Sequence, residues 1–131
     1  MRRTTAIVGV GVCTALGACT ESTLPKDRVC TTEARPSVSV LVRDAVSGTT
    51  ITPGSTVHVL DGAFVDSIVV PSDWNPLFRV TPWDTYERPG TYTVRGRKAG
   101  YAEASLSGIR VTADECHVRT VAVDLLLRPV P

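Results

Sequence analysis

Four cysteines are the residues of this sequence most able to do chemistry, and they stand at positions 13, 19, 30 and 116. A thiol can be acylated, oxidised to a disulfide or deprotonated to bind a metal. The chain has two histidines, and one of them, His117, directly follows Cys116. A single Cys-His pair is too small for a structural zinc site, which takes four ligands. The position of each cysteine along the chain then decides which reaction is open to it.

The other chemically capable side chains do not form a catalytic set. The sequence has no HExxH, GxSxG, phosphate-binding-loop or paired CxxC motif. His58 falls at an outward position of an expected strand, and the adjacent carboxylates of Asp114 and Glu115 are typical of a solvated turn. We therefore predict that the protein is not an enzyme and that it uses no metal and no cofactor.

Two tryptophans are candidates for binding. Trp74 and Trp83 both lie among polar residues and prolines, between expected strands. Exposed aromatic rings can stack on sugar rings or on a partner peptide. The same two rings could instead close one open end of a small sandwich, and the sequence leaves both interpretations open.

The charges of the chain are almost balanced, with 14 Lys+Arg against 13 Asp+Glu. Phosphate-backbone binding needs a concentrated basic surface, so we expect no nucleic-acid partner. The one basic cluster is Arg95-Gly96-Arg97-Lys98. It fits a solvated hairpin face, or a contact to acidic lipid head groups or polysaccharide.

Residues 1–18 have the pattern of a secretory signal peptide. Arg2 and Arg3 are basic, and residues 6–18 carry no charge. This apolar segment is too short to cross a hydrocarbon core, which takes about 20 residues. A basic start, a short apolar middle and small residues at the end predict a segment that is removed from the mature protein.

The end of this segment, Leu16-Gly17-Ala18-Cys19, resembles the lipobox of bacterial lipoproteins. The resemblance implies a diacylglyceryl group on the Cys19 thiol, cleavage just before Cys19 and acylation of the new amino terminus. Two or more acyl chains hold a protein stably on a bilayer where one does not. We therefore expect a lipid-anchored protein of the cell envelope. Because Thr20 rather than aspartate follows Cys19, the resemblance favours the outer membrane.

With Cys13 removed and Cys19 lipidated, as this resemblance implies, Cys30 and Cys116 remain. Two thiols in an exported, oxidising compartment favour one disulfide. Two free thiols, or a metal pair with His117, are the alternatives. A Cys30–Cys116 bond would require the first and last strands to begin side by side, either as roughly parallel neighbours or facing each other across two sheets.

Residues 19–36 are polar and contain two prolines, which predicts a tether, and residues 37–131 predict one β-domain. In the domain, valines alternate with polar residues and the turns are rich in glycine and proline. This pattern predicts an all-β sandwich. The expected strands, about seven, fall near residues 37–43, 56–60, 64–70, 77–80, 91–95, 101–111 with a break at Gly108, and 117–127.

Several stretches of the domain resemble carboxypeptidase regulatory-like domains. They are residues 37–44 followed by Ser47-Gly48, Pro89-Gly90-Thr91-Tyr92-Thr93-Val94, and Ala99-Gly100-Tyr101. The resemblance covers residues 37–128 and implies a transthyretin-like, or prealbumin-like, sandwich of seven strands with no catalytic residue. Residues 61–86 match that family poorly. Gly90 and Gly100 are expected to adopt positive φ at tight turns.

Two functions follow from these observations. The first is a binding module for a glycan or a peptide, which would use the loops around Trp74 and Trp83. The alternative is a structural or assembly subunit that adds a strand partner to an envelope complex.

Overall fold

The computed structural model describes residues 29–131. The predicted signal peptide, the lipidation site at Cys19 and the tether as far as residue 28 lie outside the described residues.

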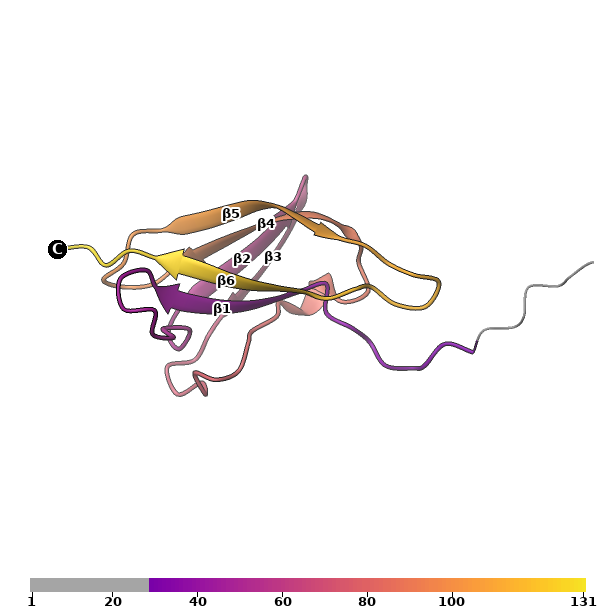
Figure 1. Cartoon of the computed structure of the whole chain (residues 1–131), viewed down its shortest axis with the longest axis horizontal. Helices are drawn as coiled ribbons and strands as arrows, with labels where there is room; N and C mark the ends of the chain where they lie inside the picture. Colours follow the sequence, from indigo (N-terminus) through magenta and orange to yellow (C-terminus); the bar gives the residue numbers. More distant parts are fainter. Residues whose placement is uncertain (1–28) are drawn as a thin grey trace, which may run out of the picture.

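The described chain forms two β-sheets packed face to face (Figure 1). The smaller sheet pairs β1 (Val38–Asp44) with β6 (Val121–Leu127) in parallel. The larger sheet is antiparallel and has the order β3-β2-β4-β5. Its strands are β2 (Thr56–Asp61), β3 (Phe64–Val69), β4 (Gly90–Arg97) and β5 (Ala104–Val111). A single 3-10 turn, η1 (Trp83–Thr85), lies between β3 and β4. The predicted all-β sandwich is confirmed.

The core follows from the alternation of side chains along each strand. Successive side chains of a strand point to opposite faces, so apolar residues at every second position form one buried face. The buried set includes Val38, Val40 and Val42 of β1, Val57 and Val59 of β2, Tyr92 and Val94 of β4, and Val123, Leu125 and Leu127 of β6. The outward positions are mostly polar, so each sheet keeps one face in water.

Six strands form rather than the expected seven, because residues 77–80 do not make a strand. Val80 alone bridges Val40 of β1, and the side chain of Leu77 is 82% exposed. Prolines at 76 and 82 flank the segment and have no N–H to donate to a ladder. The predicted break at Gly108 is an irregularity inside one strand, β5: its register with β4 shifts between Leu106 and Ile109, and Gly108 has a φ of 76°.

The disulfide forms between Cys30 and Cys116, with their Cα atoms 5.3 Å apart. Cys30 precedes β1 and Cys116 precedes β6. The two strands start side by side, with Val38 opposite Val121, and run parallel. The predicted cysteine pairing and the predicted adjacency of the first and last strands are therefore both confirmed.

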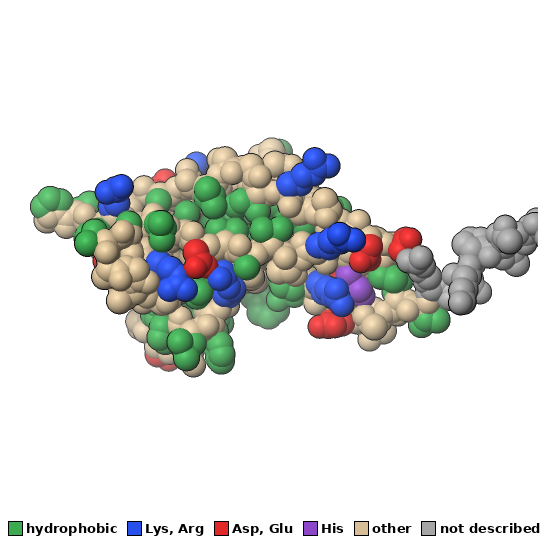
Figure 2. Space-filling view, viewed as in Figure 1, with side chains coloured by type: hydrophobic (Ala, Val, Ile, Leu, Met, Phe, Trp, Pro, Cys, Tyr) green, Lys and Arg blue, Asp and Glu red, His purple; other side chains and the backbone are tan. Residues whose placement is uncertain are grey.

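The surface carries charges of both signs. Figure 2 shows basic and acidic side chains interspersed over the visible face, with hydrophobic side chains gathered near its centre. No helix within residues 29–131 has the length and apolar character needed to cross a bilayer.

Candidate functional site

Both tryptophans line one hollow of about 460 Å³ at the β3 edge of the sandwich. One wall comes from Ile68 and Val69 of β3. The rest comes from the connection between β3 and β4, which carries Trp74, Trp83 and Tyr86. The structure therefore brings together the two rings that the sequence singled out. We call this hollow the aromatic pocket.

Trp74 forms a fixed wall of the aromatic pocket. Its side chain is partly buried and packs against the hydrophobic core. The indole Nε1–H donates a hydrogen bond of 3.1 Å to the carbonyl of Phe78. An indole held by core packing on one side and by a hydrogen bond at its edge loses little freedom when a ligand binds. Of the two rings that could close an open end of the sandwich, only Trp74 packs against the core, and Trp83 is exposed.

Trp83 is the exposed ring of the pocket, with 79% of its surface accessible. Its ring lies 6.3 Å from that of Tyr86, with an angle of 19° between the two planes. The turn that carries it is tied to the domain, because Asp84 N–H donates to Asp66 Oδ2 at 2.7 Å and Ser37 N–H donates to the Thr85 carbonyl at 3.1 Å. Trp83 is therefore a large exposed apolar side chain on a turn that hydrogen bonds hold in place.

Arg79 also lines the aromatic pocket, but its hydrogen bonds go to the protein. Its guanidinium donates to the carbonyls of Ser39 and Val123, at 3.3 and 2.9 Å, and to Asp124 Oδ1 at 2.6 Å. Hydrogen bonds from Arg43 and then from Arg79 hold the pKa of Asp124 below its usual value, so this carboxylate is charged and pairs with both cations. The pocket is thus mainly aromatic and aliphatic, which suits a neutral ligand.

The segments around the disulfide carry a polar cluster, which begins at Glu87, the residue after Tyr86 of the pocket. His117 Nδ1 lies 2.8 Å from Glu87 Oε1, and His117 Nε2 lies 2.8 Å from Thr31 Oγ1. Hydroxyl, imidazole and carboxylate stand here in the order of a Ser-His-Asp triad. Glu87 also accepts backbone N–H groups from Arg35 at 2.7 Å and Val118 at 3.0 Å. The cluster therefore ties three separate segments of the chain together beside the disulfide.

The backbone angle and the pKa of Glu87 show how firmly this cluster is held. Glu87 has a φ of 50°, a left-handed conformation that is costly for a non-glycine residue. The hydrogen bond from Val118 N–H, with those from Arg35 and His117, keeps the pKa of Glu87 below its usual value. Asp114 caps the neighbouring turn by accepting the N–H groups of His117 and Cys116. We assign these contacts to fastening the N-terminal end of the domain.

Within residues 29–131, no group of three or more His, Cys, Asp and Glu side chains is arranged to hold a metal ion. Cys116 is in the disulfide, so the alternative of a Cys30–Cys116 metal pair with His117 is excluded in this structure.

Comparisons with known proteins give few matches to this chain. No family model and no curated protein matches it. Among solved structures, it is similar to a candidate carbohydrate-binding protein from Bacteroides uniformis ATCC 8492, with 14% identity and a TM-score of 0.44. The similarity covers 72% of this chain and 43% of that protein, so the chain spans less than half of its neighbour.

Sequence reasoning found the two tryptophans but missed their partners. Tyr86 stands three residues after Trp83, a spacing that was visible, yet nothing in the sequence says that the two rings face each other. Ile68 and Val69 were expected only as strand residues. Thr31 and His117 are 86 positions apart, and no local signal links them.

Proposed function

We propose that this protein is a non-enzymatic, lipid-anchored protein of the cell envelope whose β-sandwich binds a neutral glycan in the aromatic pocket. The observation that carries the proposal is the convergence of Trp74, Trp83 and Tyr86 on one hollow at the sheet edge. The volume, about 460 Å³, lies within the range of small-ligand sites, about 300–1,000 Å³.

The chemistry of the pocket favours sugar rings. Pyranose rings present apolar C–H faces and hydroxyl edges, and aromatic side chains with a polar tip match both kinds of surface. The phenol of Tyr86 and the hydroxyl of Thr81 line the pocket and can exchange hydrogen bonds with sugar hydroxyls. Because Arg79 is already engaged by Asp124 and two carbonyls, the ligand need carry no charge.

The test is a titration of the full-length protein with neutral and acidic envelope polysaccharides, in which tryptophan fluorescence reports binding. We expect neutral polysaccharide to quench the emission. Trp83→Ala should weaken binding at least tenfold, which is about 1.4 kcal/mol, because it removes the exposed stacking surface. Phe78→Ala is the matched control, since Phe78 is an exposed aromatic residue outside the pocket lining. Equal binding by Trp83→Ala and the wild type would refute the proposal.

One observation favours the alternative function, an assembly subunit of an envelope complex. β3 is an edge strand, and Val70 N–H donates to the Ser55 carbonyl. By antiparallel alternation, the backbone groups of Val65 and Val69 therefore point away from β2. The Val69 side chain is 75% exposed. An exposed edge of this kind can accept a strand from a partner.

Crosslinking and pull-down from membranes distinguishes the two functions. An assembly role predicts one envelope protein that co-purifies with the wild type and is lost in Val65→Lys, because a lysine on an edge strand opposes strand addition. A glycan-binding role predicts that Val65→Lys leaves polysaccharide quenching unchanged, while Trp83→Ala removes it.

The proposed anchor has its own test, based on the lipobox-like residues 16–19. We expect Cys19→Ser to move the protein from the membrane fraction to the soluble fraction and to prevent labelling by a radioactive fatty acid, because the thiol that carries the acyl chains is gone. Fractionation on a density gradient checks the favoured outer-membrane location. A Cys19→Ser variant that stays on the membrane and still carries lipid would show that the anchor is wrongly assigned.

A further inference from the structure

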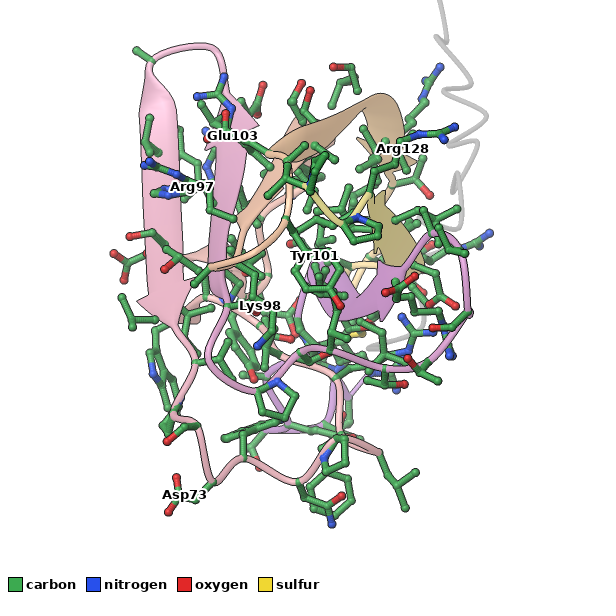
Figure 3. The ribbon with its side chains drawn as sticks, turned by 90° about the vertical axis from the view of Figure 1, so that its left-hand side faces the viewer. Asp73, Arg97, Lys98, Tyr101, Glu103 and Arg128 are labelled. Carbon is green, nitrogen blue, oxygen red and sulfur yellow. A yellow bond between two sulfur atoms is a disulfide. The ribbon has the colours of Figure 1, made fainter. Side chains whose placement is uncertain are left out.

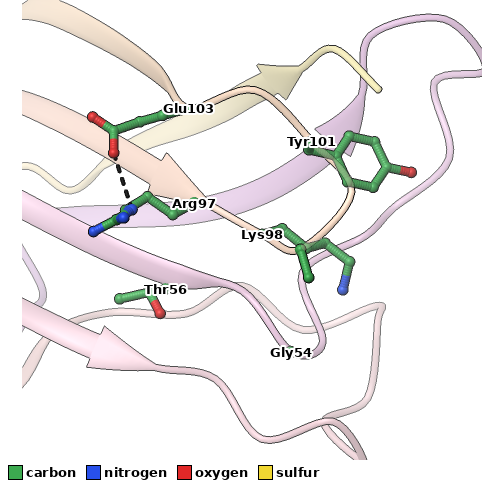
Figure 4. Close-up of a pocket in the computed structure, with 7 residues that line it drawn as sticks. Gly54, Thr56, Arg97, Lys98, Tyr101 and Glu103 are labelled. Carbon is green, nitrogen blue, oxygen red and sulfur yellow. Dashed lines mark ion pairs between the residues drawn. The ribbon is translucent and has the colours of Figure 1, made fainter. Parts of the chain in front are cut away.

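A second hollow, of about 430 Å³, has a different chemistry from the aromatic pocket. It lies where β2 begins and β4 ends, and it is lined by Thr56, Arg97, Lys98, Tyr101 and Glu103 (Figure 4). Three of these five side chains carry a charge at neutral pH. The cations belong to the basic cluster of residues 95–98, which the aromatic pocket does not use.

One carboxylate holds two of the arginines of this cluster. Glu103 forms ion pairs with both: its Oε2 lies 3.1 Å from Nε of Arg97, and its Oε1 lies 3.4 Å from Nε of Arg95. An arginine has five N–H donors, and Nε supplies only one of them. Among residues 29–131, the terminal amino groups of Arg95 and Arg97 have no other partner, so both present unused donors to solvent.

Lys98 is the second cation that lines the hollow. Its ammonium donates to the Pro53 carbonyl and lies against Gly54, only 3.3 Å from where a Cβ at that position would stand. A lysine has three N–H donors, so two remain after the bond to Pro53. A residue larger than glycine at position 54 would therefore crowd the ammonium.

The charges of the hollow do not cancel. Arg97 and Lys98 line it against the single carboxylate of Glu103, and Arg95, which lies outside the lining, shares that carboxylate. The next carboxylate, Asp44, accepts the Tyr101 hydroxyl at 3.0 Å and the N–H groups of the turn that follows it. Figure 4 shows the Tyr101 hydroxyl directed away from Arg97 and Lys98, so Asp44 lies beyond the ring. The hollow is left with an excess of positive charge.

We propose that this hollow binds the carboxylate or phosphate group of an acidic polysaccharide. Guanidinium groups recognise such anions with paired, charge-assisted hydrogen bonds, and the Lys98 ammonium adds a second positive charge on the Gly54 side of the hollow. Glu103 pairs with Nε of both arginines, which leaves their terminal amino groups free of that contact.

The position of the hollow favours a polymer over the head groups of the anchoring membrane, an argument that rests on the proposed lipid anchor. The described chain starts at residue 29 at one end of the sandwich, and the C-terminus lies at the other (Figure 1). Figure 3 looks onto the end that carries the C-terminus and shows Lys98 and Tyr101 there. A domain held to a membrane by its N-terminal side would direct this end away from the bilayer.

The experiment is affinity electrophoresis of the full-length protein in neutral detergent, in gels containing polygalacturonate or neutral dextran. We expect polygalacturonate to retard the protein and salt to weaken the effect, whereas any retardation by dextran would come from the aromatic pocket and should not depend on salt. The double variant Arg97→Gln/Lys98→Gln should lose at least tenfold in affinity, whereas Glu103→Gln should bind more tightly because it removes the one opposing charge. Thermal unfolding verifies that each variant is folded.

Two controls separate this site from general charge and from the aromatic pocket. Arg110→Gln removes an exposed arginine of β5 outside the hollow, and it should bind as the wild type does. Trp83→Ala should also leave retardation unchanged, so failure of the glycan proposal and failure of this one give different results. Equal losses in Arg110→Gln and the double variant would overturn the proposal. So would binding to phosphatidylglycerol vesicles without binding to polygalacturonate.

Discussion

Glycines on and beside β4 show how one residue type serves different purposes. Gly100 has a φ of 82°, as its turn position predicts. Gly90 does not have a positive φ, so that expectation was wrong. A Cβ at position 90 would instead meet the carboxylate of Asp61, which pairs with Arg88 at 2.7 Å. The absence of a side chain at 90 leaves room for that ion pair.

Gly96 gives the sharpest prediction at the residue scale. It is buried on β4, and a Cβ there would overlap Cδ2 of Leu125 on β6. We expect Gly96→Ala to lower the free energy of unfolding by about 1–3 kcal/mol, because the core must shift to admit the methyl group. Urea unfolding measures the loss. Thr91→Ala, at an exposed position of the same strand, should change the stability by less than about 0.5 kcal/mol.

At the scale of elements, the pairing of β1 with β6 depends on contacts between the two ends of the domain. The two strands are parallel, so no short turn could connect them. Seven residue pairs join them, from Val38–Val121 to Asp44–Leu127. The segments that lead into β1 and β6 are held together by the disulfide and by the Thr31–His117–Glu87 contacts.

The disulfide therefore stabilises this element pair. The two cysteines are 86 positions apart, and a cross-link closing a loop of that length contributes at most about 4–5 kcal/mol through the entropy of the unfolded chain. We expect the variant Cys30→Ser/Cys116→Ser to keep its far-ultraviolet circular dichroism but to unfold at a lower urea concentration. Addition of a reductant to the wild type should reproduce this shift. A double variant as stable as the oxidised wild type would contradict the assignment.

At the scale of the whole molecule, four carboxyl groups hold the chain together. Some link segments that are distant in the sequence, and the others cap turns. Each has a pKa below its usual value. The Ser47 N–H is the main cause for Asp44, the Val118 N–H for Glu87, the His117 N–H for Asp114, and Arg43 for Asp124. The folded state therefore favours the ionised form of all four groups.

The pH dependence of stability follows from these directions. A depressed folded pKa stabilises the fold at pH values above the unfolded pKa, and this stabilisation is lost as the pH falls through the folded pKa. Ordinary values are 3.8 for Asp and 4.5 for Glu, so we expect a constant melting temperature from neutral pH to about pH 5 and a fall below about pH 4. Glu87→Gln should reduce the acid-dependent part of this fall. Asp73→Asn, in an exposed loop, should follow the wild-type curve. A melting temperature that rises below pH 4 would contradict this account.

The sequence by itself determined the fold class, and together with the lipobox resemblance it predicted the disulfide partners. Alternating valines along residues 38–42, 56–60 and 121–127 define strands through the direction of neighbouring side chains, which is a local property of the chain. The Asp61-Gly62 turn between β2 and β3 is local in the same way. The lipid anchor and its membrane remain predictions from residues 16–19.

Only the tertiary structure decided what the side chains do together. The sequence did not show that residues 77–80 would form a single bridge, because that depends on how the chain crosses from one sheet to the other. Nor did it show that Trp83 would face Tyr86 beside β3, or that Glu87 would reach Val118. Strand periodicity is set by residues two positions apart, whereas the contacts of Val80 with Val40 and of Glu87 with Val118 join residues brought close by packing of the two sheets. The Trp83–Tyr86 contact is local, and only its place beside β3 depends on that packing. The physical basis of the site is therefore long-range, and the basis of the fold class is local.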